Sequence, residues 1–390
     1  MIMISPFILL TIASFASAWK DLSDNTLNFL PNPSDADFDI NTGKLLSPIL
    51  IPRVPGTEGS LKVLNHFHNF FTSELPSWTL ATQNSSSVTP TSNGKEVPFV
   101  NFMATRDPPW AQPGDVGRLV LVAHYDSKLT PKDFIGATDS AVPCALLLHI
   151  AQSIDAALTR KWADLEAKGE TGDDLDDDDD IARKGIMLLF LDGEEAFHNW
   201  SDDDSLYGAR SLAETWEASH HPALSSRHNE IANVDLFLLL DLLGSQNPRV
   251  PSYFKTTHWA YNLMSDLETR MRESNLFLSH EASPGKWFYD LPMKAASADW
   301  HSILDDHIPF QARGVEIFHV IPIPFPNVWH TMNDDGKHLD MQTVKDWAYL
   351  TTAFTAAWLE LEGHVEAPLD TAGKIIDDIG INKREYKSEL

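Results

Sequence analysis

Four long apolar runs constrain what this chain of 390 residues can fold into. Each run is rich in leucine, isoleucine or valine, which is typical of strands buried on both faces in a mostly parallel sheet covered by helices. The runs are 118–126 (RLVLVAHYD), 185–192 (GIMLLFLD), 234–241 (VDLFLLLD) and 316–323 (EIFHVIPI). Strand and helix patterns alternate from Arg118 onward, with no linker or internal repeat. The sequence therefore predicts a single α/β domain with a mixed, mostly parallel central sheet flanked by helices.

Helical spacing of apolar side chains predicts the elements between these runs. In the stretch before the first run, Leu61, Leu64, Phe67, Phe70 and Phe71 keep that spacing. The expected helices lie at 57–75, 139–157 (with Pro143 in its first turn), 206–219, 258–273 and 344–361, and a further strand lies at 97–103.

Acidic and histidine side chains stand at or just after the ends of the apolar runs. In open α/β sheets, ligands bind outside the carboxyl ends of the strands. Side chains gathered there are candidates for one metal site, and this arrangement favours a zinc hydrolase-like enzyme. These positions are His124, Asp126, Asp139, Glu194, Glu195, Asp241 and His330.

A catalytic zinc site keeps three protein ligands and one open position, and Asp139, Glu195 and His330 would supply two oxygens and one nitrogen. Of the adjacent Glu194 and Glu195, one can bind the metal while the other faces the substrate as a proton carrier. Taken singly, each residue has a simpler interpretation: Asp139 as the N-cap of a helix, and the two glutamates as a solvated pair. However, a buried strand leads straight into the glutamates, where charge without a purpose is costly.

Composition limits the classes of partner. The net charge is −27, and seven aspartates fall between Asp173 and Asp180. We interpret residues 170–182 as a solvated acidic insertion. An acidic surface excludes nucleic-acid binding, which needs clustered Lys and Arg. The one cysteine, Cys144, cannot form an intrachain disulfide.

The two ends of the chain indicate a secretory-pathway protein. Residues 1–18 are apolar and end in Ala-Ser-Ala, which is typical of a signal peptide, or of a membrane anchor if uncleaved. The terminus KSEL differs from the ER-retrieval signal KDEL at one position, which predicts the ER lumen or secretion. Residues 19–44 form a polar, loosely held lead-in, 45–365 a catalytic domain and 366–390 a tail.

Five segments together resemble the glutaminyl-peptide cyclotransferases (glutaminyl cyclases) of the zinc aminopeptidase-like superfamily, over residues 45 to 362. The resemblance implies a zinc exopeptidase-like fold. It also implies an acyltransferase that converts N-terminal glutamine of peptides or proteins to pyroglutamate, with one zinc ion per chain. Nothing in the sequence demands assembly, so we expect a monomer. The segments are 136–148 (GATDSAVPCALLL), 190–210 (FLDGEEAFHNWSDDDSLYGAR), 238–248 (LLLDLLGSQNP), 305–310 (DDHIPF) and 319–332 (HVIPIPFPNVWHTM).

The resemblance also assigns roles to residues. It implies that Asp139, Glu195 and His330 bind the zinc and that Glu194 is the catalytic acid and base. Asp241 and Asp305 are implied to share a hydrogen-bond network with Glu194. The residues implied to line or adjoin the substrate pocket are Trp200, Ile303, Phe325, Trp329 and His319, the last also open to a purely structural interpretation.

Two positions depart from the family pattern. Ala123 stands where the animal secreted enzymes carry a cysteine that pairs with the equivalent of Cys144, so Cys144 is expected to be free and packed in its helix. Leu304 stands where those enzymes usually have glutamine.

Two alternatives remain open at this point. A zinc aminopeptidase of the same superfamily would bind a second metal through His124 and Asp241. A non-catalytic module would have lost the site.

Overall fold

The computed structural model describes residues 21–171, 182–289 and 303–367. The expected signal segment 1–18, nearly all of the acidic insertion and the KSEL terminus lie outside the described residues.

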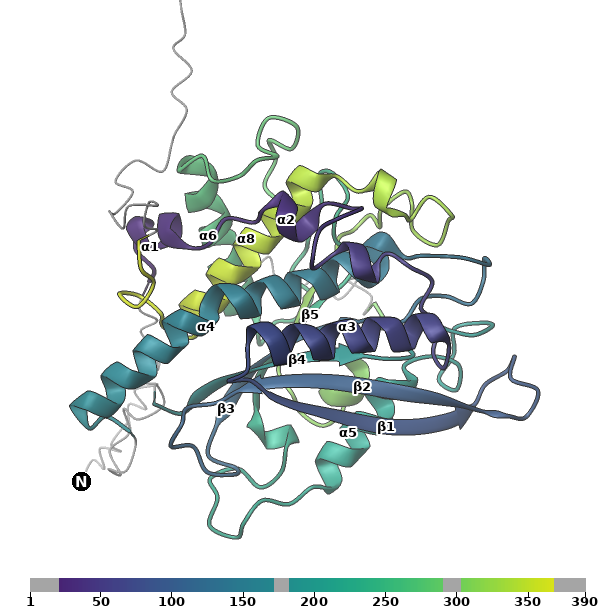
Figure 1. Ribbon diagram of the computed structural model, residues 1–390, viewed down its shortest axis with the longest axis horizontal. Coiled ribbons are helices and arrows are strands. Elements are labelled where there is room, and N and C mark those ends of the chain that lie inside the picture. Colours follow the sequence, from purple (N-terminus) through teal and green to yellow (C-terminus); the bar gives the residue numbers. More distant parts are fainter. Residues whose placement is uncertain (1–20, 172–181, 290–302, 368–390) are drawn as a thin grey trace, which may run out of the picture.

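A six-stranded mixed sheet forms the centre of the molecule (Figure 1). Its strand order is β1-β2-β4-β3-β5-β6. The pairs β4–β3, β3–β5 and β5–β6 are parallel, whereas β1–β2 and β2–β4 are antiparallel. This confirms the predicted mixed, mostly parallel sheet. The strands are β1 (Thr79–Val88), β2 (Glu96–Arg106), β3 (Gly117–His124), β4 (Lys184–Leu191), β5 (Val234–Leu240) and β6 (Ile317–Val320).

Helices cover both faces of the sheet. In Figure 1, α3 and α4 lie on one side of the strands and α5 lies on the other. The buried side chains of α3, α4, α6 and α8 form one core cluster, and those of α5 and α7 join a second cluster. The helices are α1 (Asp24–Phe29), α2 (Asp35–Phe38), α3 (Glu58–Glu74), α4 (Val142–Lys168), α5 (Tyr207–Ala218), α6 (His258–Glu273), α7 (Ile308–Gln311) and α8 (Met341–Trp358).

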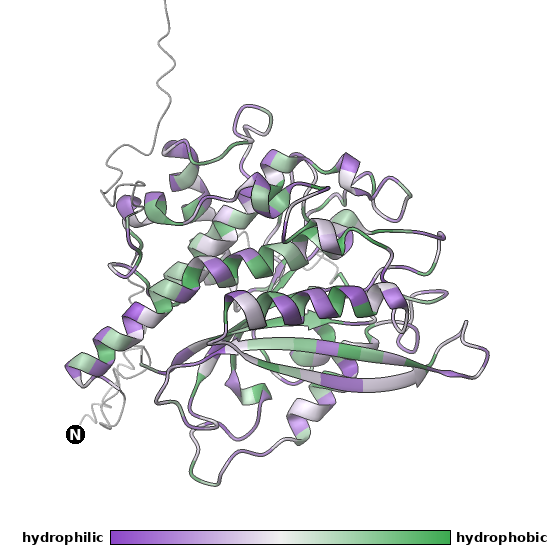
Figure 2. Ribbon diagram, viewed as in Figure 1, coloured by the Kyte–Doolittle hydropathy of each residue, from purple (hydrophilic) through white to green (hydrophobic). Residues whose placement is uncertain are grey.

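The central strands are apolar on both faces because each face packs on helices. In β3, Leu119 and Leu121 enter the cluster under α3 and α4, whereas Val120 and Val122 enter the cluster under α5. This is the period-two alternation of a strand. Figure 2 shows α4 and the central strands as mostly hydrophobic, while α3 alternates between hydrophobic and hydrophilic residues. A continuous apolar run is therefore what a doubly covered strand needs.

Several elements differ from the sequence prediction. The edge strand β1 was not predicted, because its sequence TLATQNSSSV is polar and its side chains are mostly exposed. Helix α4 begins at Val142, after a distorted turn over Ala137–Ala141, and ends at Lys168 rather than near residue 157. In α3, Leu61 is exposed, and the buried face carries Val63, Phe67, Phe70 and Phe71.

The expectation that residues 19–44 are loosely held is wrong for the described part of that segment. Leu22, Leu27, Leu30 and Phe38 are buried in the larger core cluster. The Tyr349 hydroxyl of α8 also donates a hydrogen bond to the carbonyl of Leu27. A few leucines at helical positions are enough to dock a segment whose overall composition is polar.

Candidate active site

Asp139, Glu195 and His330 come together at one edge of the sheet. Asp139 lies in the turn between β3 and α4, Glu195 follows β4, and His330 lies in the loop after β6. One oxygen or nitrogen from each lies within 4.8 Å of the others. The His330 Nε2 atom is 3.4 Å from Asp139 Oδ2 and 3.7 Å from Glu195 Oε1. The structure thus brings together the three residues predicted as metal ligands.

The surroundings of this group fit a cation. Glu195 is buried, and its Oε1 atom has no hydrogen-bond donor. A buried carboxylate oxygen without a donor is costly unless a positive charge lies beside it. Two carboxylates and one imidazole are a ligand set that zinc accepts. His330 is also held in the left-handed backbone region, at φ +55°, which is a strained conformation for histidine.

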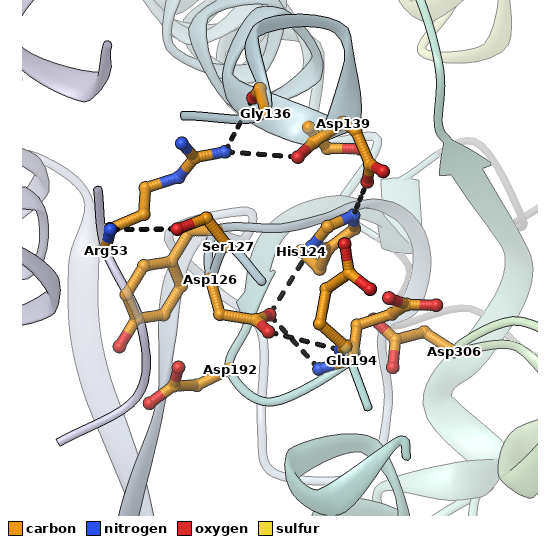
Figure 3. Close-up of polar contacts among 12 residues, drawn as sticks. Arg53, His124, Asp126, Ser127, Gly136, Asp139, Asp192, Glu194 and Asp306 are labelled. Carbon is orange, nitrogen blue, oxygen red and sulfur yellow. Dashed lines mark hydrogen bonds and ion pairs between the residues drawn. The ribbon is translucent and has the colours of Figure 1, made fainter. Parts of the chain in front are cut away.

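Asp126 fixes the orientation of the two glutamates. Its Oδ1 atom accepts the backbone N–H of Glu194, and its Oδ2 atom accepts the backbone N–H of Glu195, both at 3.1 Å (Figure 3). Lys128 donates to Glu195 Oε2 at 3.0 Å, so the side chain of Glu195 is turned toward Asp139 and Lys128. Glu194 takes no part in either possible metal group among the described residues. The adjacent glutamates are therefore separated into one candidate ligand and one free carboxyl group.

The pKa of Glu194 lies well above its usual range. Burial is the main cause, opposed by His124 and reinforced by the nearby carboxylates of Glu195 and Asp305. A carboxyl group whose pKa is raised from its usual range is better able both to accept and to donate a proton. Glu194 is therefore the candidate proton carrier.

Asp241 and Asp305 are both buried near the glutamates. Asp241 accepts from the Ser140 hydroxyl and, at 2.8 Å, from the backbone N–H of Leu242. Asp305 pairs with His319 at 2.8 Å. The hydrogen-bond network with Glu194 that the resemblance implies remains a prediction.

The pKa values of the two aspartates differ in direction. Burial raises the pKa of Asp241, and the neighbouring Asp305 adds to this. Burial also opposes ionisation of Asp305, yet its pKa lies below its usual range because His319 donates to it. His319 is only 2% exposed. Its imidazole contacts Asp305 at 2.8 Å, and it offers almost no exposed surface to a substrate.

The residues predicted to line the substrate pocket include three aromatic side chains. Trp200 and Trp329 are each 38% exposed, and Phe325 and Ile303 are partly buried. The ring of Trp329 stacks on the imidazole of His330, with centroids 3.9 Å apart, and contacts the ring of Phe325 at 4.9 Å. We name the exposed side chains Trp200, Leu304 and Trp329 the apolar rim.

Two residues that the sequence did not single out hold the turn of Asp139 in place. The Arg53 guanidinium donates to the carbonyls of Gly136 and Asp139 (Figure 3), and also to the carbonyl of Ile135. Asp334 accepts the N–H and the hydroxyl of Thr138, at 2.7 and 2.9 Å.

Both residues are nearly or fully buried. Arg53 satisfies the carbonyls of the turn and Asp334 satisfies its donors, so Asp139 is fixed from both sides. No motif or spacing marks either position in the sequence.

A second possible metal group consists of His124, Asp139 and Asp241. The imidazole of His124 lies among carboxylates: Nε2 is 3.0 Å from Asp139 and Nδ1 is 3.4 Å from Asp126. Burial lowers the pKa of His124, but hydrogen bonds with Asp126, Asp139 and Asp241 raise it well above its ordinary value overall. In this group His124 Nε2 is already hydrogen-bonded to Asp139 and Asp241 already accepts two hydrogen bonds, whereas Glu195 Oε1 in the first group has no donor. This group is therefore the weaker candidate.

Cys144 is free and buried, as predicted. Its thiol contacts the carbonyl of His124 at 3.2 Å. Burial raises its pKa to about 12, so the thiol is neutral and takes no part in the site's chemistry.

Comparisons with known proteins agree with the geometry. The model of peptidase family M28 matches residues 109–355. A glutaminyl-peptide cyclotransferase of Bothrops jararaca is 37% identical over 322 residues, covering 81% of this chain and 80% of that protein. A glutaminyl-peptide cyclotransferase-like protein of Bos taurus is 38% identical over 320 residues, covering 81% and 74%. The crystal structure of Macrostomum lignano glutaminyl cyclase superposes with a TM-score of 0.71 at 28% identity, covering 90% of this chain and 97% of that one.

Proposed function

This chain belongs to the glutaminyl-peptide cyclotransferases within peptidase family M28, and from this premise we propose that it converts N-terminal glutamine of peptides and proteins to pyroglutamate. The observation that carries the proposal is the pair Glu194 and Glu195. One carboxylate faces Asp139 and His330, while the other belongs to neither possible metal group among the described residues and has a raised pKa. Cyclisation needs this division between a ligand and a proton carrier.

We propose that Asp139, Glu195 and His330 hold one zinc ion per chain. The support is their mutual distance and the buried Glu195 oxygen that has no donor. The chemistry that zinc supplies when bound there is polarisation of the γ-amide carbonyl of the substrate glutamine. Lys128 would balance the second oxygen of Glu195, at 3.0 Å.

Glu194 would move the proton that the reaction requires. The α-amine attacks the γ-amide carbon, a C–N bond forms, and the bond to the amide nitrogen breaks. Glu194 takes a proton from the α-amine and delivers it to the departing nitrogen, which leaves as ammonia. The two reacting groups are tethered in one residue, so the protein needs only to fold the glutamine side chain back on itself. Water is not a reactant, and the apolar rim would exclude it.

The aminopeptidase alternative would use a second metal at His124. The hydrogen bond between this imidazole and Asp139, at 3.0 Å, and the two that Asp241 accepts from Ser140 and Leu242 disfavour that use. A single-metal cyclase therefore fits the described residues better.

A coupled ammonia assay on Gln-Gly dipeptide, with and without a chelator, tests the proposed function. We expect ammonia release that stops on metal removal and returns with zinc. Leucine amide serves as the second substrate. Leucine release without ammonia from Gln-Gly would contradict the proposal and favour the aminopeptidase.

A further inference from the structure

A groove lies beside Trp200 and Leu304 of the apolar rim. It has a cavity volume of about 280 Å³, bounded by the start of α5 on one side and by α7 on the other. Binding pockets for whole drug-sized ligands are roughly 300–1,000 Å³, so this groove suits one or two amino-acid side chains. Its principal lining residues are Trp200, Leu206, Leu304, Ile308, Pro309 and Ala312.

Both walls of the groove continue from segments that carry the candidate catalytic carboxylates. The backbone N–H of Leu206 donates to the carbonyl of Glu194 at 3.0 Å. On the other wall, the N–H of Ile308 donates to the carbonyl of Asp305 at 3.0 Å, and Leu304 directly precedes Asp305. Backbone hydrogen bonds thus tie both walls of the groove to the segments of Glu194 and Asp305, which places the groove next to the site.

The groove presents apolar surface to solvent. Leu304 is 51% exposed and Trp200 is 38% exposed, and both are shared with the apolar rim. When a ligand covers exposed leucine and tryptophan side chains, apolar surface is removed from water, and this contributes to the free energy of binding. Leu304 matters particularly, because the sequence places it where the resembling secreted enzymes usually carry glutamine.

The charges around the groove disfavour an acidic ligand. The two arginines that line it are already engaged: Arg210 donates to the carbonyl of Asp202 and lies over the Tyr207 ring. Arg313 pairs with Glu217 at 2.9 Å. Within the described residues, no ion pair involves the carboxylates of Asp202 and Glu214, which also line the groove. Three carboxylates, of Asp202, Glu214 and Glu217, thus stand against the two guanidinium groups, so the edge of the groove has a small excess of negative charge.

We propose that this groove is a subsite for a large apolar side chain at the second or third position of the substrate peptide, with Leu304 and Trp200 as its specificity-determining contacts. The inference rests on the proposed function, because the glutamine must first occupy the site beside Glu194. The acidic edge favours a basic residue next to the apolar one and disfavours an acidic one.

The test compares kcat/KM for ammonia release from Gln-Gly-amide, Gln-Leu-amide and Gln-Gly-Leu-amide, using the full chain loaded with zinc. We expect the wild-type protein to prefer at least one leucine peptide by roughly tenfold over Gln-Gly-amide, the scale of hydrophobic discrimination by a pocket. Leu304→Gln is expected to reduce that preference at least threefold. Leu304 is half exposed, so this substitution leaves the fold intact.

A matched control carries the same substitution elsewhere. Leu224 is 99% exposed and lies outside the site, so Leu224→Gln is expected to keep the wild-type preference. Equal rates on all three peptides, or an unchanged preference in Leu304→Gln, would overturn the subsite while leaving the cyclase activity standing. Failure to release ammonia from any of the peptides would instead count against the proposed function.

A second pair of peptides tests the charge. Gln-Leu-Lys-amide is expected to have a higher kcat/KM than Gln-Leu-Glu-amide, and Glu214→Gln is expected to narrow the difference. The reverse order in the wild-type protein would contradict the acidic edge as part of the subsite.

Discussion

The turn that carries Asp139 and the apolar rim are both part of one site, yet they are built in different ways. Asp139 is 3% exposed, and buried hydrogen bonds from Arg53 and to Asp334 hold its turn on both sides. In the rim, Trp200 and Leu304 are 38% and 51% exposed and are positioned mainly by packing. Buried hydrogen bonds therefore hold the turn of the candidate ligand Asp139, and we expect few substitutions to be tolerated there. Substitutions in the apolar rim are expected to be tolerated and to alter which peptides fit.

The largest expected effect separates the two adjacent glutamates. Glu194→Gln is expected to reduce kcat by about 10³-fold or more while keeping the zinc, because the amide cannot move a proton. Glu195→Ala is expected to lose both turnover and zinc. Elemental analysis of the purified variants beside the ammonia assay measures this. Loss of zinc from Glu194→Gln would place Glu194 among the metal ligands and contradict its role as a free proton carrier.

The next effect tests whether buried hydrogen bonds fix the metal geometry. Arg53→Met removes the buried hydrogen bonds that the guanidinium donates to the turn of Asp139, so we expect a loss of roughly 3 kcal/mol in the free energy of unfolding. We also expect zinc affinity to fall about 10- to 100-fold, as for other residues that orient metal ligands. Urea denaturation and competition with a chelator provide the two measurements. If stability falls while zinc affinity does not, Arg53 is structural only.

Asp346 provides a contrast with Asp334. It holds a loop in the same manner, accepting the N–H groups of Leu278 and Ser279, but it has no contact with the site. Asp346→Asn is therefore expected to leave zinc affinity unchanged, whereas Asp334→Asn lowers it about tenfold. Equal effects of the two substitutions on zinc affinity would show that the hydrogen bonds of Asp334 to the turn of Asp139 make no particular contribution to zinc binding.

Asp346 also predicts a pH dependence of stability. Burial raises its pKa to about 6, above the ordinary value of 3.8. Its contribution to stability is therefore fully present below pH 3.8 and is lost as the pH rises through 6. The free energy of unfolding of the wild-type protein should fall by roughly 2–3 kcal/mol relative to Asp346→Asn between pH 4 and pH 7. A difference that is independent of pH would contradict the raised pKa.

The smallest effect is expected at the rim. Trp200→Phe keeps an aromatic ring but loses contact area, so we expect kcat/KM to fall only a few-fold, with unchanged zinc content. The loss should be greater for Gln-Leu-amide than for Gln-Gly-amide. A loss as large as that of Glu194→Gln would mean that Trp200 contributes to the chemical step and not only to substrate binding.

The sequence predicted best what depends on continuous apolar runs and helical periodicity. The four buried strands, α6 and the grouping of Asp139, Glu195 and His330 all follow from patterns or from the resemblance. The edge strand β1 was missed because its polar, exposed side chains carry no hydrophobic signal. The docking of Leu22 to Phe38 was missed because a few apolar contacts outweigh a polar composition.

Other features of the site depend on tertiary contacts that no local pattern records. Arg53 is 86 residues from Asp139, and Asp334 is 196 residues from Thr138. The network expected for Asp241 and Asp305 remains a prediction, and their contacts with Ser140 and His319 were not foreseen. Periodicity describes which face of an element is buried, but not which distant polar group completes a turn.

Anomalous diffraction at the zinc edge, from crystals of the zinc-loaded protein, shows which of the two adjacent glutamates binds the metal. We predict a single peak bounded by Asp139, Glu195 and His330, with the Glu194 carboxyl group outside the coordination sphere. A peak bound by Glu194, or a second peak between His124, Asp139 and Asp241, would contradict it.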